Sequence, residues 1–305
     1  MTFPIVKTTD GVRLHVTDSG ASGAADPILF LHEFAGNYRS WAAQVAALCD
    51  EHRCITFAAR GYPPSDVPAN SDAYSWQRAV DDAVAVLDAL DIESAHIVGI
   101  SMGGYTAVQV GLKHPERVRS VMAVSVGSGS DPGIRSAYLE EARIVADQLR
   151  ARGTEFVGRS MAEGPSRIQL KNRSAAAWQQ MIDQFAEQSA DGMALTILEV
   201  QAKRPSFHDL LDELSTFARP LLVVDGDEDE ACLSTGRLLK QTVPACGWRV
   251  LPNSGHVLNL EDPALFNDIV RRFIAQVEVG AWPERDPRSK VTLQFNLESE
   301  IAVSV

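Results

Sequence analysis

The sequence predicts an α/β fold, with a mostly parallel sheet of about eight strands, helices on both faces and a helical lid inserted after the sixth strand. Three observations lead to this prediction. Short apolar runs alternate with longer stretches of helical period along most of the chain. Several runs, such as residues 27–31, are apolar throughout, which is typical of strands buried on both faces. The alternation is interrupted once, between Gly127 and Phe217, where there are helical stretches but no convincing strand.

The individual elements follow from this alternation. The first two strands, residues 5–8 and 12–18, are expected to form a hairpin around Asp10-Gly11, because Asp-Gly between alternating segments favours a tight turn. The other strands are expected at residues 27–31, 54–57, 96–100, 118–126, 220–225 and 248–251. Helices are expected at residues 41–49, 76–90, 102–114 and 263–277. Such an alternation implies parallel strands joined by helical crossovers.

The interruption defines the predicted domain organisation. Helices are expected inside it at residues 135–152, 154–162, 175–189 and 193–202. A helical insertion there would cover the carboxyl ends of the strands, where α/β sheets bind ligands, so we expect a lid. The predicted units are a core of residues 1–127 and 218–280, a helical lid of residues 128–217 and a C-terminal extension of residues 281–305. For the extension we expect either a loosely attached tail or a late strand starting at Val291.

Composition excludes several function classes. The 305 residues carry a formal net charge of -12, whereas nucleic acids and anionic membranes are bound by basic surfaces. We therefore expect neither as a partner. No apolar run reaches membrane-spanning length and no signal peptide is recognisable, so a cytoplasmic location is expected. The cysteines show no zinc-site or disulfide spacing, which favours free buried thiols; they are Cys49, Cys54, Cys232 and Cys246.

The most informative stretch is Gly99-Ile100-Ser101-Met102-Gly103, where a predicted strand turns into a predicted helix. Small residues two before and two after Ser101 allow a sharp strand-to-helix turn that holds the serine at the edge of the sheet. The following helix directs backbone N–H groups to the same place, where they can stabilise negative charge on a bound carbonyl oxygen. This context is typical of a serine nucleophile.

A serine nucleophile needs a base to take its proton and a third group to orient that base. His256 follows the last predicted strand and precedes the final helix, so it lies at the same edge as Ser101. The preceding strand ends in the carboxylate-rich segment 225–230. The order serine, acid, histidine is that of nucleophile-elbow enzymes.

These features resemble the α/β-hydrolase superfamily, of the lidded esterase, lactonase and carbon–carbon bond hydrolase type, from about residue 5 to about residue 277. The segments that carry the resemblance are LHEFAG at 31–36, ARGYPPSD at 59–66, the serine turn, GDED at 226–229 and NSGH at 253–256. The resemblance implies Ser101 as nucleophile, His256 as general base and Asp229 as orienting acid. It also implies an oxyanion hole made by the N–H groups of Phe34 and Met102. Acyl transfer through a serine ester requires no cofactor, and no metal is expected.

Some assignments stay open. Asp229 fits the Gly-x-x-Asp spacing, with Asp225 and Asp131 as alternative acids. Glu33 stands where such families usually carry glycine. We expect it either to pair with a surface cation such as Arg39, or to act near the serine site by hydrogen bonding or by repelling anionic substrates. His32 is expected to hold the neighbouring loop through hydrogen bonds.

Aromatic side chains of the lid recur at the helical spacing of a packed interior. Some of them must nevertheless line the pocket if the lid covers it. Our candidates for substrate contact are Tyr138 and Trp178, together with Glu33.

The predicted function is that of a serine hydrolase, which cleaves an ester or lactone of a small molecule through an acyl-enzyme on Ser101. Two alternatives use the same scaffold as enzymes: a carbon–carbon bond hydrolase of a diketone-like ring-cleavage product, and a cofactor-independent peroxidase or oxygenase. A third is a ligand-binding receptor with slow turnover, because fold alone does not settle function. The expected partner is a small-molecule substrate, and a homodimer is left open.

Overall fold

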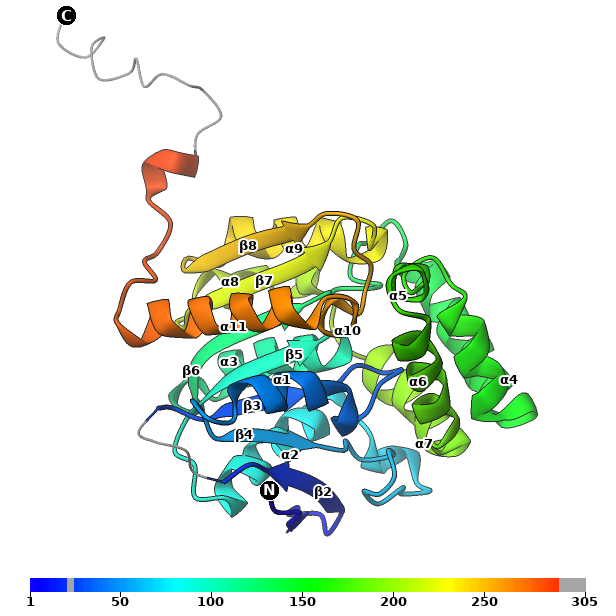
Figure 1. Ribbon diagram of the computed structural model, residues 1–305. Helices are drawn as coiled ribbons and strands as arrows, with labels where there is room; N and C mark the ends of the chain where they lie inside the picture. Colours follow the sequence, from blue (N-terminus) through cyan, green and yellow to red (C-terminus); the bar gives the residue numbers. More distant parts are fainter. Residues whose placement is uncertain (21–24, 291–305) are drawn as a thin grey trace, which may run out of the picture.

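The computed structural model describes residues 1–20 and 25–290. Its centre is an eight-stranded sheet in the order β1-β2-β4-β3-β5-β6-β7-β8 (Figure 1). The strands are β1 (Ile5–Lys7), β2 (Arg13–Asp18), β3 (Ile28–Leu31), β4 (Cys54–Phe57), β5 (Ala95–Ile100), β6 (Val118–Val124), β7 (Leu221–Gly226) and β8 (Cys246–Leu251). From β4 to β8 all neighbours are parallel, whereas β1 and β2 form an antiparallel hairpin. The predicted mostly parallel sheet is confirmed.

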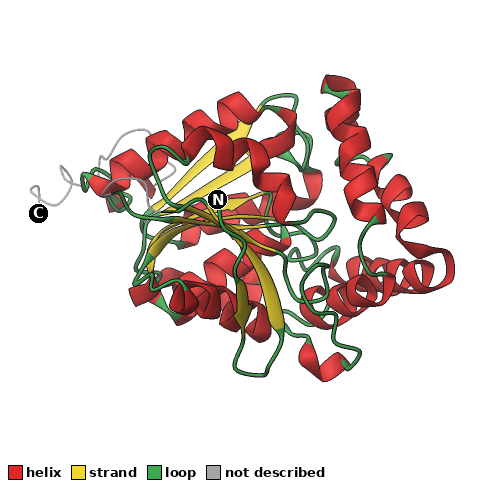
Figure 2. Cartoon of the chain, turned by 60° about the horizontal axis from the view of Figure 1, so that its bottom comes forward, coloured by secondary structure: helices red, strands yellow, loops and turns green. Residues whose placement is uncertain are grey.

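Helices cover both faces of this sheet (Figure 2). One face packs against α1 (Ala42–Leu48) and α11 (Pro263–Glu278), in a cluster that includes Phe30 and Phe266. The other face packs against α2 (Trp76–Ala89), α3 (Met102–Lys113) and α9 (Glu230–Thr242). Because both faces are covered, β3 and β5 are buried at every position, which explains why their sequences are apolar apart from His96.

The strand register brings five loops to one edge of the sheet. The last residues of β3, β5, β6, β7 and β8 are close to level across the ladder. The pairs that show this are Leu31 with Gly99, Ile100 with Val124, Val124 with Val224, and Gly226 with Leu251. The chain therefore leaves all five strands at the same carboxyl edge, which is where a ligand site is expected in this architecture.

Between β6 and β7 the chain forms helices only, in a part that is fully described. We call residues 128–217 the helical insertion. Its α-helices are α4 (Arg135–Ala162), α5 (Ile168–Arg173), α6 (Ala175–Ala186), α7 (Ala190–Leu195) and α8 (Leu211–Ser215). Figure 1 shows α4 to α7 gathered beyond one end of the strands. The two helices expected at 135–152 and 154–162 are both part of α4, which is broken at Gly153 by a left-handed φ of 80°.

Four α-helices of the described part of the chain were not predicted from the sequence. They are α5, α8, α9 and the short α10 (Leu258–Glu261). Three of them are too short to show a hydrophobic period. α9 begins at Glu230, the last residue of the carboxylate-rich segment 225–230, and this segment is typical of a loop rather than of the first turn of a helix.

The first residues of the C-terminal extension are attached to the core. The Trp282 indole N–H donates to the carbonyl of Ala245 at 2.9 Å, and its ring packs edge-on against Phe273. The expectation of a loosely attached tail is therefore wrong for this part, because an aromatic side chain anchors it. The late strand expected from Val291 lies outside the described residues.

Two expectations from composition concern the membrane and the thiols. None of the helices in the described ranges is both long and apolar enough to cross a membrane. All four cysteines are free; Cys54, Cys232 and Cys246 are buried, and Cys49 is half-buried. The prediction of free thiols is confirmed, and only Cys49 departs from the expected burial.

Candidate active site

Ser101 occupies the sharp turn between β5 and α3, as its sequence context predicts. Its φ of 53° and ψ of -111° lie in a strained region for a residue with a Cβ. A Cβ at Gly99 would lie 2.2 Å from the carbonyl oxygen of Gly103, and one at Gly103 would lie 2.2 Å from that of Leu31. Only glycine fits at either position, so these two residues are what allows the serine turn to form.

The two backbone N–H groups of the candidate oxyanion hole make no hydrogen bond within the described residues. Within the described ranges, neither Phe34 nor Met102 donates its N–H to another group of the chain. Met102 is the first residue of α3, so its N–H is one of the amides that a helix leaves unpaired at its start. Both groups are available to a negatively charged oxygen beside Ser101.

The loop that carries Phe34 is held by His32, as expected. His32 Nδ1 donates to the carbonyl of Glu33 at 2.7 Å, and Nε2 accepts the N–H of Ala59 at 3.1 Å. Burial lowers the pKa of His32 to about 4, so the ring is neutral and can make one bond of each kind. The Tyr62 hydroxyl donates to the carbonyl of Phe34 at 2.9 Å and fixes the loop at a second point.

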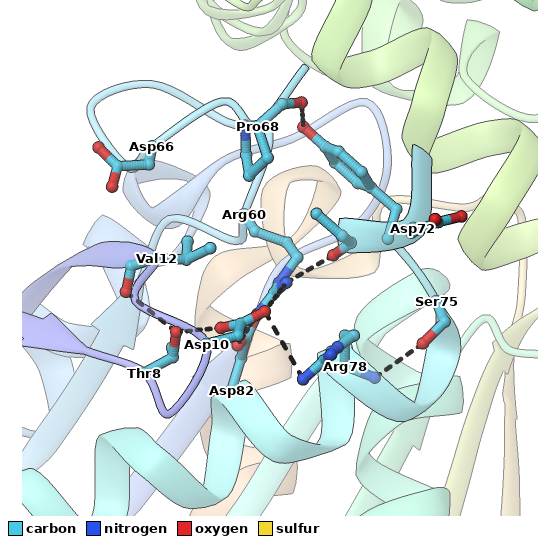
Figure 3. Close-up of polar contacts among 12 residues, drawn as sticks. Thr8, Asp10, Val12, Arg60, Asp66, Pro68, Asp72, Ser75, Arg78 and Asp82 are labelled. Carbon is cyan, nitrogen blue, oxygen red and sulfur yellow. Dashed lines mark hydrogen bonds and ion pairs between the residues drawn. The ribbon is translucent and has the colours of Figure 1, made fainter. Parts of the chain in front are cut away.

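Tyr62 itself belongs to a loop that a buried ion network anchors (Figure 3). Arg60 is 4% exposed and pairs with Asp82 of α2 at 2.6 Å and with Asp10 of the N-terminal hairpin at 2.9 Å. This network joins the hairpin, the loop after β4 and α2. It therefore supports the oxyanion loop indirectly, through Tyr62 and Ala59.

Asp229 and His256 form a buried pair. His256 Nδ1 donates to Asp229 Oδ2 at 2.7 Å, and the two residues are 5% and 1% exposed. Burial lowers the pKa of His256, but the neighbouring Asp229 outweighs it and the net shift is upward. Burial likewise raises the pKa of Asp229, yet the charge and hydrogen bond of His256 leave it below its usual value. The carboxylate orients the imidazole and leaves Nε2 free to act as a base.

The two alternative acids are placed elsewhere. Asp225 accepts the indole N–H of Trp248 at 2.7 Å, and burial raises its pKa to about 7. Asp131 accepts the N–H of Gly133 at 2.8 Å, within its own turn. Of the three carboxylates, Asp229 is the one that contacts the histidine.

The loop that carries His256 is fixed from two sides. The carboxylate of Glu261 accepts the N–H groups of Gly255 and Val257, at 2.9 and 3.1 Å. The backbone N–H of His256 donates to the carbonyl of Ser166 in the helical insertion, at 2.8 Å. The insertion thus contacts the histidine loop directly.

Glu33 is buried and forms an ion pair with Arg167 of the helical insertion. The expectation that it pairs with Arg39 is wrong, because Arg39 pairs with Glu187 instead. The other expectation, a place near the serine site, agrees with the structure. Glu33 Oε2 lies 3.8 Å from Nε2 of His256.

A cavity of about 660 Å³ joins these groups. Its walls come from the loops at the carboxyl edge of the sheet, including Ser101, Glu33, Phe34, Asp229 and His256, and from the helical insertion, mainly α4 and residues 164–167. The structure therefore brings the predicted serine, acid and histidine to one cavity, and the insertion closes one side of it.

The two aromatic candidates for substrate contact differ in their position relative to the cavity. Tyr138 lines the cavity. Trp178 does not, so the expectation for this residue is wrong. Its indole N–H donates to the carbonyl of Ala162 at 2.8 Å, and its ring packs in the interior of the insertion with Met181 and Ile182.

Sequence reasoning missed three residues at the site: Arg167, Ser166 and Glu261. The Glu261 carboxylate and the Ser166 carbonyl accept hydrogen bonds from backbone N–H groups of the histidine loop. No sequence motif encodes such contacts. Arg167 had an indirect signal, because a carboxylate predicted next to the oxyanion loop needs a cationic partner once it is buried. Its partner lies 134 residues away in the chain, so the sequence could not identify it.

Among residues 1–20 and 25–290, two groups of side chains have the composition of a metal site. Asp229, Cys232 and His256 have atoms within 4.8 Å of one another, and so do Asp26, His96 and Glu278. In the first group, burial raises the pKa of Cys232 well above its usual value, so the thiol stays protonated and is a weak ligand. That the protein needs no metal and no cofactor stays a prediction.

Comparison with known proteins agrees with this geometry. A family model described as alpha/beta hydrolase fold matches residues 26–263. The 3-oxoadipate enol-lactonase 1 of Acinetobacter baylyi is 28% identical over 278 residues, 90% of this chain and 97% of the lactonase. The 2-hydroxymuconate semialdehyde hydrolase of Pseudomonas sp. is 26% identical over 284 residues, 89% of this chain and 93% of that hydrolase. A thermophilic esterase from Thermogutta terrifontis shares the fold with a TM-score of 0.80 at 24% identity, over 91% of this chain and 99% of the esterase. The chain therefore belongs to the α/β-hydrolase family and is an enzyme of the hydrolase type.

Proposed function

We propose that the enzyme cleaves an ester or lactone of a small molecule through an acyl-enzyme on Ser101, with His256 as base and Asp229 as its orienting acid. One observation carries the proposal. The strained Ser101 turn and the buried Asp229–His256 pair line the same cavity. Within the pair, His256 Nδ1 lies 2.7 Å from Asp229 Oδ2. A serine nucleophile, a base and an orienting carboxylate are the three groups that acyl transfer requires.

The first half of the reaction forms the acyl-enzyme. The Ser101 hydroxyl attacks the substrate carbonyl carbon while His256 Nε2 takes its proton. The carbonyl oxygen of the substrate becomes negative and accepts hydrogen bonds from the N–H groups of Phe34 and Met102. Within the described residues these two N–H groups have no other acceptor. When the intermediate collapses, the bond to the leaving alcohol breaks and His256 returns the proton to the departing oxygen.

The second half releases the acid. A water molecule attacks the serine ester while His256 takes a proton from it, and the same N–H groups hold the second oxyanion. Collapse breaks the bond to Ser101, which recovers its proton from His256. For a lactone the alcohol and the acid are parts of one product, so ring opening follows the same steps.

The relatives support an ester or lactone as the bond cleaved. One is named as an enol-lactonase, and a structural neighbour as an esterase. Relatives that are named as enzymes also weigh against the receptor alternative.

The test is turnover of short-chain 4-nitrophenyl esters and of simple lactones by three proteins. The wild type should turn over at least one substrate, and Ser101→Ala should lose several orders of magnitude in kcat/KM. Ser136→Ala is a matched control, because Ser136 is exposed on α4 and is not among the residues that line the cavity. Equal activity in Ser101→Ala and the wild type would contradict the proposal.

A further inference from the structure

We propose that the site selects substrates with an uncharged acyl group and excludes those whose acyl group ends in a carboxylate, because Glu33 neutralises Arg167. This inference rests on the proposed function, since it names the substrate class of the same site. It follows from three features of the cavity: the balance of charges on its walls, the geometry of the Glu33–Arg167 pair and the apolar rim.

The walls of the cavity carry mostly negative charge. Five carboxylate side chains line it: Glu33, Glu141, Glu228, Asp229 and Glu230. Among the described lining residues, Arg167 is the one lysine or arginine. A carboxylate at the end of a substrate's acyl group would therefore meet like charges on several sides. Such repulsion is an effective way to reject a ligand.

The charge of the single guanidinium is already paired with a carboxylate. The side chains of Arg167 and Glu33 are 8% and 3% exposed, and Arg167 Nη2 donates to Glu33 Oε2. A substrate carboxylate that approaches Arg167 would therefore meet the negative charge of Glu33 beside the guanidinium. The attraction of the cation is largely cancelled by this neighbour, so Arg167 offers little net charge to an anionic acyl group.

The position of the pair brings this selection close to the reacting atoms. Glu33 Oε2 is 3.8 Å from His256 Nε2, and Glu33 directly precedes Phe34 of the proposed oxyanion hole. The acyl group of a bound ester must lie near these groups. A negative charge on the acyl group would therefore be repelled by Glu33 at short range.

The rim of the cavity suits an uncharged acyl chain. Ile134, Ile144 and Phe156 line the cavity and are 44%, 53% and 37% exposed. Ile144 and Phe156 lie on α4, and Ile134 directly precedes it. These apolar side chains offer a surface that an alkyl or aryl acyl group would cover, with a gain from the hydrophobic effect.

The test compares two esters that differ at one end of the acyl chain. 4-Nitrophenyl valerate and 4-nitrophenyl hydrogen glutarate share the leaving group and the chain length, but the glutarate replaces the terminal methyl with a carboxylate. The ratio of their kcat/KM values is corrected by their rates of hydrolysis in buffer. For the wild type we expect a ratio of about tenfold or more in favour of the valerate.

Variants identify the cause of this ratio. Glu33→Gln frees Arg167, so the preference should fall by about tenfold or reverse. Adding Arg167→Met to Glu33→Gln removes the freed cation and should restore the preference for the valerate. Glu187→Gln is the matched control: it removes a carboxylate that also pairs with an arginine between core and insertion, but outside the cavity lining, and should leave the ratio unchanged.

The outcomes separate this inference from the proposed function. Turnover of the valerate that depends on Ser101, with equal or better turnover of the hydrogen glutarate by the wild type, would overturn the inference alone. An unchanged ratio in a folded Glu33→Gln would also overturn it. Absence of turnover with both esters and with lactones would contradict the proposed function itself. If Glu33→Gln does not fold, the ratio of kcat/KM values measured for the wild type decides whether the inference holds.

Discussion

His256 lies between two carboxylates: Nδ1 donates to Asp229 at 2.7 Å, and Nε2 is 3.8 Å from Glu33 Oε2. The second carboxylate is unusual at this place, because Nε2 is the atom that must take the proton of Ser101 in the proposed mechanism. A negative charge there stabilises the imidazolium form, whereas the guanidinium of Arg167 acts in the opposite direction. The ion pair therefore influences the base as well as the substrate.

The first prediction concerns the pH dependence of activity. The base must be neutral, so kcat/KM should rise with pH as His256 loses its proton. Because the net shift raises its pKa, this rise should be centred above 6.5. Glu33→Gln removes a charge that raises this pKa and should move the rise to lower pH, whereas Arg167→Met should move it to higher pH. The measurement is kcat/KM for a neutral ester from about pH 5 to pH 9.

The control for this profile is Glu187→Gln, whose midpoint should match that of the wild type because Glu187 lies outside the cavity lining. Shifts of Glu33→Gln and Arg167→Met in the same direction would contradict the electrostatic coupling. A merely structural role of the pair would lower kcat/KM in both variants without moving the midpoint.

The second prediction separates the two buried aspartates. Asp229→Asn should lower kcat/KM by on the order of 10³ to 10⁴, because the imidazole loses the carboxylate that sets its tautomer and stabilises its charge. Asp225→Asn should cost much less. Burial raises the pKa of Asp225 to about 7, so near that pH an amide resembles the neutral acid that already accepts the Trp248 indole N–H. Steady-state kinetics of both variants checks this, and a larger loss in Asp225→Asn would reassign the acid.

The third prediction concerns the serine turn. Gly103→Ala places a methyl group 2.2 Å from the Leu31 carbonyl, which is backbone and cannot move aside. We expect a loss of at least about 3 kcal/mol in the free energy of unfolding, measured with denaturant. In the control Gly133→Ala, the nearest atom is 3.2 Å away at the end of the Asp131 side chain, which needs to shift only slightly, so the change should be small. Equal stability of the two variants would contradict the proposed role of Gly103.

The fourth prediction concerns the buried network in Figure 3. Asp82→Asn leaves the Arg60 guanidinium with less negative charge around it, and the free energy of unfolding should fall by about 3 to 5 kcal/mol. The matched control is Asp66→Asn, whose partner Arg13 is 68% exposed, and it should cost no more than about 1 kcal/mol. Chemical denaturation of both variants is the measurement. A similar cost in the two would show that burial of the Arg60 pair adds no stability.

Much of the fold and the central residues of the site could be predicted because their signals are local. Gly99 and Gly103 flank Ser101 within five consecutive residues, and the apolar strand before them is visible in the sequence. Asp229 and His256 each follow a predicted strand, so topology alone brings them to the edge that carries Ser101. These features need no knowledge of distant contacts.

The rest depends on packing between segments that are far apart in the chain. Glu33 and Arg167 meet across 134 residues, and no spacing rule connects them. Trp178 has the same sequence signal whether its ring faces the cavity or the interior of the helical insertion, and the structure turns it to the interior. Short helices such as α5 form because neighbouring elements cover them, and they show no period of their own.

The most direct test of the central claim is to find the atom that becomes acylated. The enzyme is treated with a fluorophosphonate, and the adduct is located by intact mass and peptide mapping. The account predicts one adduct per chain, on Ser101, together with loss of ester turnover and no adduct in Ser101→Ala. A wild type that hydrolyses esters while the probe leaves Ser101 unmodified, or modifies another residue, would contradict the assignment of Ser101 as nucleophile.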